Sequence, residues 1–243
     1  MIAFIKRFST FEKVYFTLCI IAMVVCLILQ SSVISVIMVT LSLTAGLLNS
    51  KRIKIALLIF SITSIIYAYI SYSNGFIGEA IINVFYNMPI YLISFIRSDK
   101  KRNSVMVEIN HVNKKYWFWI VPIAIIFTIG YGYLLQLISG ITIGGITIAK
   151  VSLPFSNAFS TCILIIAVFL TSQRYLEQWY IWLISNVVLL AMWIIAIVNG
   201  GSNDYALVVQ NLSFIGINLN GLLQWRKVDK ILKKDTIKGE EKT

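Results

Sequence analysis

The sequence predicts an all-α, polytopic membrane protein, and its composition carries this prediction. Of its 243 residues, 58% are hydrophobic and only 13% are charged, and the mean hydropathy is +0.84. A soluble domain normally carries about 25% charged residues, so this chain has too little polar surface to cover a globule in water. In lipid, by contrast, apolar segments of about 20 residues cross the bilayer as helices.

Eight apolar segments follow one another along the chain, and breaks rich in Ser, Asn and Gly separate most of them. They are 14–30, 33–50, 54–72, 76–96, 116–138, 151–171, 178–198 and 204–225. A long polar stretch, RSDKKRNSVMVEINHVNKK, separates the fourth segment from the fifth. The first segment follows basic residues but has no small-residue cleavage site after it, so we expect it to be retained. It either spans the bilayer or lies along the interface.

The basic residues orient these segments. If the first segment runs outward from the cytoplasm, Lys150 alone among the 21 Lys and Arg residues falls outside. This distribution obeys the positive-inside rule, so we expect a bacterial cytoplasmic membrane protein with a cytoplasmic C-terminus. Membrane lipid, and not nucleic acid, is then the partner that the net charge of +11 indicates.

An internal repeat organises the chain. The stretch 32–52 resembles 154–174 at a constant offset of 122, and each is followed by an apolar span, an Asn-Gly turn and an acidic residue. Three spans in each unit, with one span between them, make the two units parallel in the membrane. The predicted organisation is an N-terminal helix in 1–31, a first three-helix repeat in 32–97, a basic cytoplasmic loop and linker helix in 98–150, a second three-helix repeat in 151–226, and a basic cytoplasmic tail in 227–243.

Groups for acid–base, nucleophilic or metal catalysis do not form a recognisable motif in this sequence. The acids Glu79, Glu177 and Asp204 lie near segment ends, and His111 lies in the basic loop. The three cysteines fall inside apolar segments and form no CxxC pair. We therefore expect no catalytic residues, no metal, no cofactor and no enzyme activity. A proton-coupled pump would also need a carboxylate at mid-depth, which this reading does not provide.

Neutral polar and aromatic residues are instead concentrated inside the spans. In segment 178–198, two tryptophans and an asparagine of the stretch RYLEQWYIWLISN share one helix face with a third tryptophan, within an arc of about 60°. The candidate binding residues are Trp179, Trp182, Asn186 and Trp193 in this segment, Asn83, Tyr86 and Asn87 in the fourth, Asn157 in the sixth, and Asn211 and Asn218 in the eighth.

Two structural roles compete with ligand binding. Trp179 and Trp225 lie near the cytoplasmic boundary, where tryptophan commonly anchors a helix at the interface, and we favour this role for both. Asparagines also join helices in membranes at about 0.6–2 kcal/mol per contact. Trp182 and Asn186, one turn apart inside the span, are the strongest site candidates. An indole face stacks on a planar, cationic ring, and a carboxamide pairs with amides or hydroxyls; no acid is offered as a counter-ion.

The motif R–x–x–E–x–W–x–x–W–x–x–x–N, at Arg174, Glu177, Trp179, Trp182 and Asn186, resembles the sixth core helix of PnuC-type vitamin transporters. The segments NGFIGEAIINVFYNMPIYL and NLNGLLQWRK add weaker similarity, and the likeness covers about 30–228. It implies a SWEET-like 3+1+3 helix arrangement and facilitated transport of nicotinamide riboside, a cationic pyridinium nucleoside. It also implies that a cytoplasmic kinase phosphorylates the substrate and makes uptake one-way. Trp182 and Asn186 would hold the nicotinamide, with Trp179 beside it.

Three alternatives stay open. The same type of transporter could carry thiamine or riboflavin, because segment four ends FIRSDKK and lacks the Gly–x–x–x–Trp echo found at Gly221 and Trp225. A non-transporting membrane scaffold, in which the asparagines only join helices, is a more remote alternative, as is a lipid-modifying enzyme. The sequence also leaves the oligomeric state open, including a homo-oligomer.

Overall fold

The computed structural model describes residues 9–100, 109–143, 146–147, 150–200 and 202–240. In chain order the elements are α2 (Thr10–Ile28), α3 (Val33–Ser50), α4 (Ile55–Ser73), α5 (Ile77–Ile82), η1 (Asn83–Asn87), α6 (Met88–Lys100), α7 (Lys114–Ile138), β1 (Thr142–Ile143), β2 (Ile146–Thr147), α8 (Pro154–Ser172), α9 (Gln178–Val198) and α10 (Tyr205–Glu240). Within these residues, seven helical stretches are long and apolar enough to cross a membrane, α5, η1 and α6 forming one of them. The chain is therefore a multi-pass, α-helical membrane protein, as predicted. Between α7 and α8, the two-residue strands β1 and β2 pair antiparallel.

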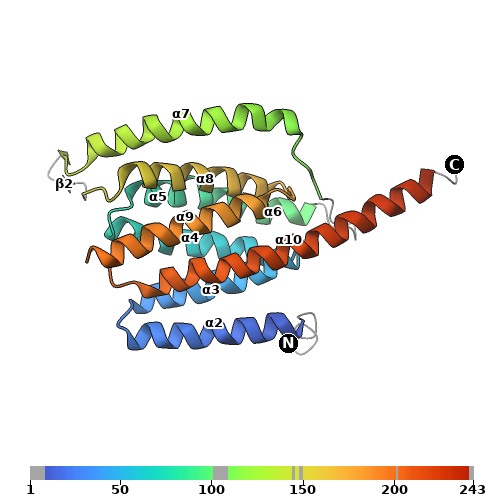
Figure 1. Cartoon of the computed structure of the whole chain (residues 1–243), viewed down its shortest axis with the longest axis horizontal. Coiled ribbons are helices and arrows are strands. Elements are labelled where there is room, and N and C mark those ends of the chain that lie inside the picture. Colours follow the sequence, from blue (N-terminus) through green and yellow to red (C-terminus); the bar gives the residue numbers. More distant parts are fainter. Residues whose placement is uncertain (1–8, 101–108, 144–145, 148–149, 201, 241–243) are drawn as a thin grey trace.

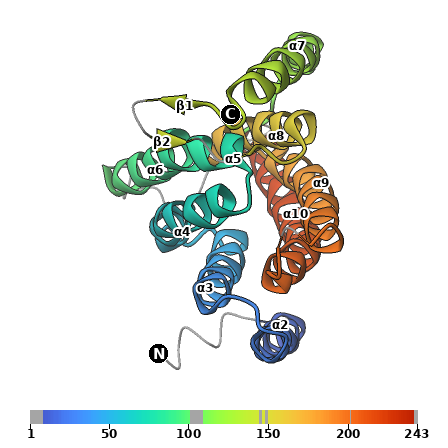
Figure 2. The same ribbon diagram turned by 90° about the vertical axis from the view of Figure 1, so that its left-hand side faces the viewer.

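The helices of the two predicted repeats pack into a closed ring (Figure 2). The first repeat places α3, α4 and the α5–α6 rod side by side, and the second places α8, α9 and α10 in the same order. Between the repeats, α3 packs on α10, and α5 packs on α8. The first helix of each repeat thus contacts the last rod of the other, which closes the ring. Helix α7 packs outside it against α8, and α2 packs outside it against α3 and α10 (Figure 1).

The turns of the two units are alike. Two left-handed backbone positions recur at matching places in both units: after the first helix, and in the Asn-Gly turn after the second. They are Arg52 and Arg174, and Gly75 and Gly200, with φ between 58° and 76°. Such a conformation is unfavourable for residues other than glycine, so its use by Arg52 and Arg174 indicates that packing imposes the same turn twice.

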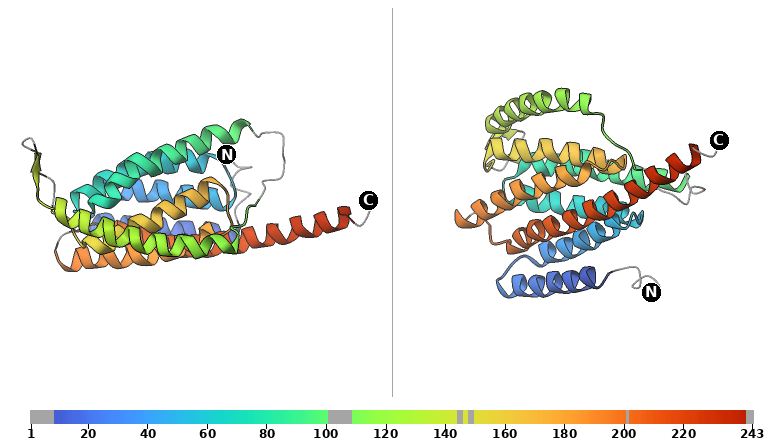
Figure 3. Two further views of the ribbon diagram at one scale, coloured as in Figure 1. Left: turned by 90° about the horizontal axis from the view of Figure 1, so that it is seen from above. Right: turned by 45° about the vertical axis from the view of Figure 1, so that its right-hand side comes forward.

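The third rods of the two repeats differ. In the first repeat the rod contains the π-helical turn η1, directly before Pro89, whereas α10 continues as one helix into the predicted tail (Figure 3). Pro89 has no N–H to donate, and in an α-helix its ring would clash with the carbonyl of Phe85. The wider turn removes this conflict and rotates the side chains that precede it.

Helix α2 is held at its first turn by one buried acid. Glu12 is 1% exposed and completes a capping box with Ser9. Its Oε1 also contacts Lys51 Nζ at 2.8 Å, and accepts hydrogen bonds from Asn220 at 3.0 Å and Gln224 at 2.8 Å. Helix α2 runs along α3 and α10 and does not lie across the end of the bundle (Figure 3).

Candidate functional site

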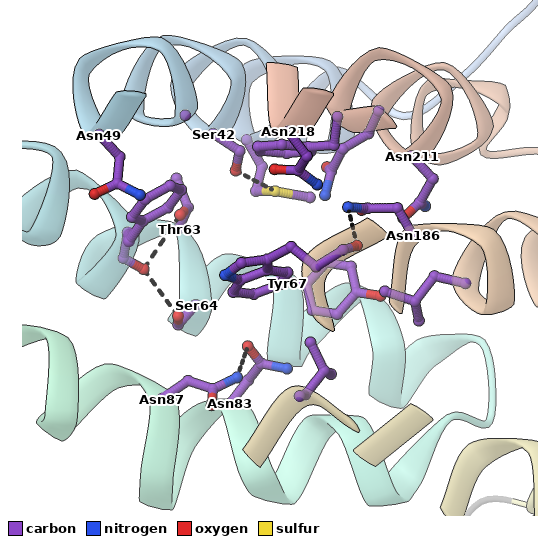
Figure 4. Close-up of a pocket in the computed structure, with 18 of the residues that line it drawn as sticks. Ser42, Asn49, Thr63, Ser64, Tyr67, Asn83, Asn87, Asn186, Asn211 and Asn218 are labelled. Atoms are coloured by element: carbon purple, nitrogen blue, oxygen red, sulfur yellow. Dashed lines mark hydrogen bonds between the residues drawn. The ribbon is translucent and has the colours of Figure 1, made fainter. Parts of the chain in front are cut away.

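A pocket lined by amide and apolar side chains lies inside the ring, and both repeats contribute to it (Figure 4). Seven of the ten predicted site residues are in its wall: Asn83 and Asn87 from the first repeat, and Trp179, Trp182, Asn186, Asn211 and Asn218 from the second. Figure 4 shows Asn83 and Asn87 on one side and Asn218 on the opposite side, with Tyr67 between them. The structure therefore gathers carboxamides that are far apart in sequence around a single cavity.

Helix α9 fixes Trp182 and Asn186 through neighbouring polar groups. The indole N–H of Trp182 donates to Thr171 Oγ1 at 2.9 Å, so the N–H is satisfied and the ring orientation is set. Asn186 Nδ2 donates to the Trp182 carbonyl oxygen at 2.7 Å. Among the described residues this leaves the Asn186 Oδ1 as an acceptor and the Trp182 ring as a stacking surface. Trp182 and Asn186 thus both line the cavity.

Trp179 and Trp225 are buried inside the protein, so the expectation that they act as interfacial anchors is wrong. They are only 2% and 3% exposed, and their rings pack edge to face with centroids 5.7 Å apart. A Cβ on Gly221 would lie 2.4 Å from Trp179 Cζ3, so the absent side chain lets this indole rest against α10. Trp179 therefore forms part of the pocket wall, and Trp225 supports it from behind.

Several amides in the pocket have a buried polar atom with no hydrogen-bond partner among the described residues. In the second repeat these atoms are Gln210 Oε1, Asn211 Oδ1 and Asn218 Nδ2, and in the first repeat Asn87 Oδ1 is one. Asn87 Nδ2 donates to Asn83 Oδ1 at 3.0 Å, which fixes the orientation of that amide. Because buried polar groups are nearly always paired, these atoms indicate a surface built to bind a polar molecule.

Three predicted residues lie outside the pocket wall. Trp193 is fully buried against Phe76, and its Nε1 donates to Tyr67 Oη at 3.3 Å. Tyr86 donates to the Ile165 carbonyl oxygen at 3.1 Å, and Asn157 Oδ1 accepts from the backbone N–H of Glu79 at 3.2 Å. Trp193 lies on the same helix face as Trp179, as the spacing predicts, but about 21 Å farther along the helix axis. It is therefore beyond the end of the pocket. For Tyr86, the π-helical turn changes the face that the spacing predicts.

The sequence analysis missed several lining residues on α3 and α4. Ser42, Gly46 and Asn49 face the pocket from α3, and Thr63 and Tyr67 face it from α4. The spacing of four and three residues on α3 is a helical stripe of small and polar residues, which could have indicated a pocket-facing surface. Single serines and threonines inside membrane helices are common, however, so the stripe is less distinctive than the indole motif.

Glu79 is the second omission, and it corrects the expectation that the site has no acid near it. Its position near a segment end is as predicted, but its side chain is fully buried, at 0% exposure. Helix α8 packs over α5 and covers it, and Ser160 and Asn157 on α8 both bond to Glu79. Position along the segment did not reveal this burial, because the covering helix comes from the other repeat.

Comparison with known proteins finds a family that spans both repeats. Residues 32–227 match the model of the nicotinamide mononucleotide transporter family, so the match starts just before α3 and ends within α10. A nicotinamide riboside transporter PnuC from Neisseria mucosa is 23% identical over 184 residues, which cover 73% of this chain and 66% of that relative.

A solved structure described as the crystal structure of the vitamin B3 transporter PnuC has the same fold. It superposes with a TM-score of 0.75 at 20% sequence identity, over 92% of this chain and 93% of that one. The family match covers both repeats and the linker helix α7, and only α2 and the end of α10 lie outside it. The chain therefore belongs to the nicotinamide mononucleotide transporter family.

Proposed function

We propose that this protein is a transporter that carries nicotinamide riboside across the bacterial cytoplasmic membrane by facilitated diffusion. The observation that carries the proposal is the pocket between the two repeats, where indole surfaces face buried amide atoms that lack partners. The family supports a transported small molecule, and the relative from Neisseria mucosa is named for nicotinamide riboside. A transporter, and not an enzyme, also agrees with the neutral chemistry of the pocket wall.

The pocket wall has the groups that this substrate requires. The pyridinium ring of nicotinamide riboside is planar and cationic. The faces of Trp182 and Trp179 attract such a ring through dispersion and the indole quadrupole. The substrate carboxamide donates and accepts, and Asn186 Oδ1 and Asn211 Oδ1 are acceptors on the second repeat. The ribose hydroxyls do the same, and Asn218 Nδ2 and Asn87 Oδ1 provide a donor and an acceptor.

The proposed mechanism is alternating access without a coupling ion. The two parallel repeats would rock about the pocket and expose it first to one side of the membrane and then to the other. Phosphorylation of the nucleoside by a cytoplasmic kinase would make uptake one-way, because the charged product no longer fits the neutral pocket. The basic loop and the C-terminal end of α10 would face the cytoplasm, in agreement with the positive-inside rule.

A ligand panel tests the substrate. Purified protein is heated with nicotinamide riboside, thiamine or riboflavin, each added singly, because a ligand that binds only the folded state raises the melting temperature. We expect a selective rise with nicotinamide riboside. A selective rise with one of the other vitamins would reassign the substrate and keep the transporter, whereas no rise with any of the three would favour a scaffold.

A further inference from the structure

Glu79 is a fully buried acid whose carboxylate contacts hydroxyl groups from both repeats. Tyr67 Oη donates to its Oε2 at 2.7 Å, and Ser160 Oγ lies 2.6 Å from its Oε1. Ser160 Oγ also lies 3.0 Å from the Asn157 carbonyl oxygen, which is farther than the 2.6 Å to the carboxylate of Glu79. Among the residues that the structure describes, no Lys, Arg or His lies within ion-pair distance of Glu79.

Two hydrogen bonds place this acid directly behind the pocket wall. Tyr67 lines the pocket (Figure 4), and its hydroxyl donates to the carboxylate of Glu79. Asn83, also in the wall, donates from Nδ2 to the backbone carbonyl oxygen of Glu79 at 2.9 Å. The carboxylate is therefore separated from the cavity by the phenol ring of Tyr67, and the backbone of Glu79 is bonded to an asparagine of the pocket wall.

The surrounding groups are arranged to stabilise the ionised form. Trp193 Nε1 donates to Tyr67 Oη at 3.3 Å, so the phenol oxygen accepts from the indole while its own proton points to Glu79. An ionised carboxylate only accepts, and both of its oxygens face a hydroxyl donor. In a medium of low polarity such bonds are stronger than in water, and a charge is weakly screened.

We propose that Glu79 determines substrate specificity by giving the pocket a negative potential that favours cationic heteroaromatic ligands over neutral ones. This inference rests on the proposed function and adds the charge that the pocket wall itself lacks. A cation in the pocket is stabilised by the unpaired carboxylate behind Tyr67, and a neutral ring of the same shape is not. Because Glu79 does not touch the ligand, it favours entry of the cation without forming an ion pair that would slow release.

The experiment compares two ligands that differ in charge. Nicotinamide riboside carries a pyridinium cation, and its reduced form has a neutral dihydropyridine ring with the same ribose and carboxamide. Their dissociation constants are measured by calorimetry on the full-length wild type, on Glu79→Gln and on Asp204→Asn. Asp204 is the matched control, because it follows the second Asn-Gly turn at the spacing at which Glu79 follows the first.

We expect the wild type to bind the cation about tenfold or more tightly than the neutral form, as one charge at this range predicts. In Glu79→Gln the cation should lose about that factor while the neutral ligand changes by less than about twofold. Asp204→Asn should keep the wild-type ratio, and Glu79→Asp, which restores the charge, should keep a preference for the cation.

Equal weakening of both ligands in Glu79→Gln would overturn the inference and leave Glu79 a structural role. If Glu79→Gln does not fold, equal affinity of the wild type for the two forms would still overturn the inference. These results leave the proposed function standing, since the substrate still binds. Failure of the wild type to bind either form would instead overturn the proposed function, and this inference with it.

Discussion

The second repeat lines the pocket with Trp179 and Trp182, whereas the first repeat, 32–97, contains no tryptophan and contributes Tyr67 and Tyr91 to the wall. Both repeats supply asparagines, but within the described residues only the first has a buried acid against the pocket wall and a π-helical turn in its third rod. The turns of the two units match closely, so the repeat preserves backbone geometry and not side-chain chemistry. The comparison teaches that one backbone arrangement, used twice in parallel, places indoles on one side of the pocket and a buried acid on the other.

Removing an indole should break this division most strongly. Trp182→Ala removes the stacking surface of the second repeat, and we expect binding of nicotinamide riboside to weaken by at least about 30-fold, with uptake abolished. Val187→Ala is the matched control, because Val187 is 57% exposed on the same helix. Radiolabelled uptake in cells, with expression checked by immunoblot, measures the effect. Normal uptake by Trp182→Ala would remove this residue from the site.

A methyl group on Gly221 should disturb the same surface from behind. In Gly221→Ala the new Cβ overlaps Trp179, so we expect a loss of about 1–3 kcal/mol in stability and a lower melting temperature. Gly130→Ala is the control, because nothing lies within 4 Å of the Cβ that it adds to α7. That change should be neutral or stabilise by about 0.5–1 kcal/mol. Equal melting temperatures for the two variants would contradict the close packing of Trp179 on α10.

Leucine variants of one pocket asparagine from each repeat compare how the amides of the two repeats contribute to binding. Asn87 in the first repeat and Asn211 in the second each bury an Oδ1 atom that has no partner among the described residues. Asn211→Leu removes a costly buried acceptor, so the ligand-free protein should keep its melting temperature or gain slightly. Asn87→Leu also removes the donor to Asn83 Oδ1, so we expect it to lower the stability by about 1–3 kcal/mol. Binding of nicotinamide riboside should weaken by about tenfold in each, since one hydrogen bond is lost. A marked fall in melting temperature without a loss of binding would show that these amides only join helices.

The spans were predictable because lipid restricts the chain to long apolar helices. The segments 33–50 and 178–198 have the same bounds as α3 and α9, and the Asn-Gly turns fall where the repeat places them. Seven of the ten candidate residues line one pocket, because a helix face can be calculated from spacing alone.

Contacts between elements were not predictable in the same way. The burial of Glu79 depends on α8 of the other repeat, and the burial of Trp179 depends on the missing side chain at Gly221. The π-helical turn follows from Pro89, but the sequence alone allows either a kink or a wider turn there. Spacing gives an angle around one axis, whereas these features require the distance and direction of a second helix.

Helix α2 lies outside the family match, yet the carboxylate of Glu12 joins it to α3 of the first repeat and α10 of the second through Lys51, Asn220 and Gln224. These contacts sit where the two repeats meet, so any separation of α3 from α10 during transport must release at least one of them. Helix α2 would then do more than enlarge the bundle, because it would also restrain the opening of the pocket. The transport rate would in that case depend on Glu12, which does not contact the substrate. Shortening the N-terminus would make transport faster and would weaken the control over when the pocket opens.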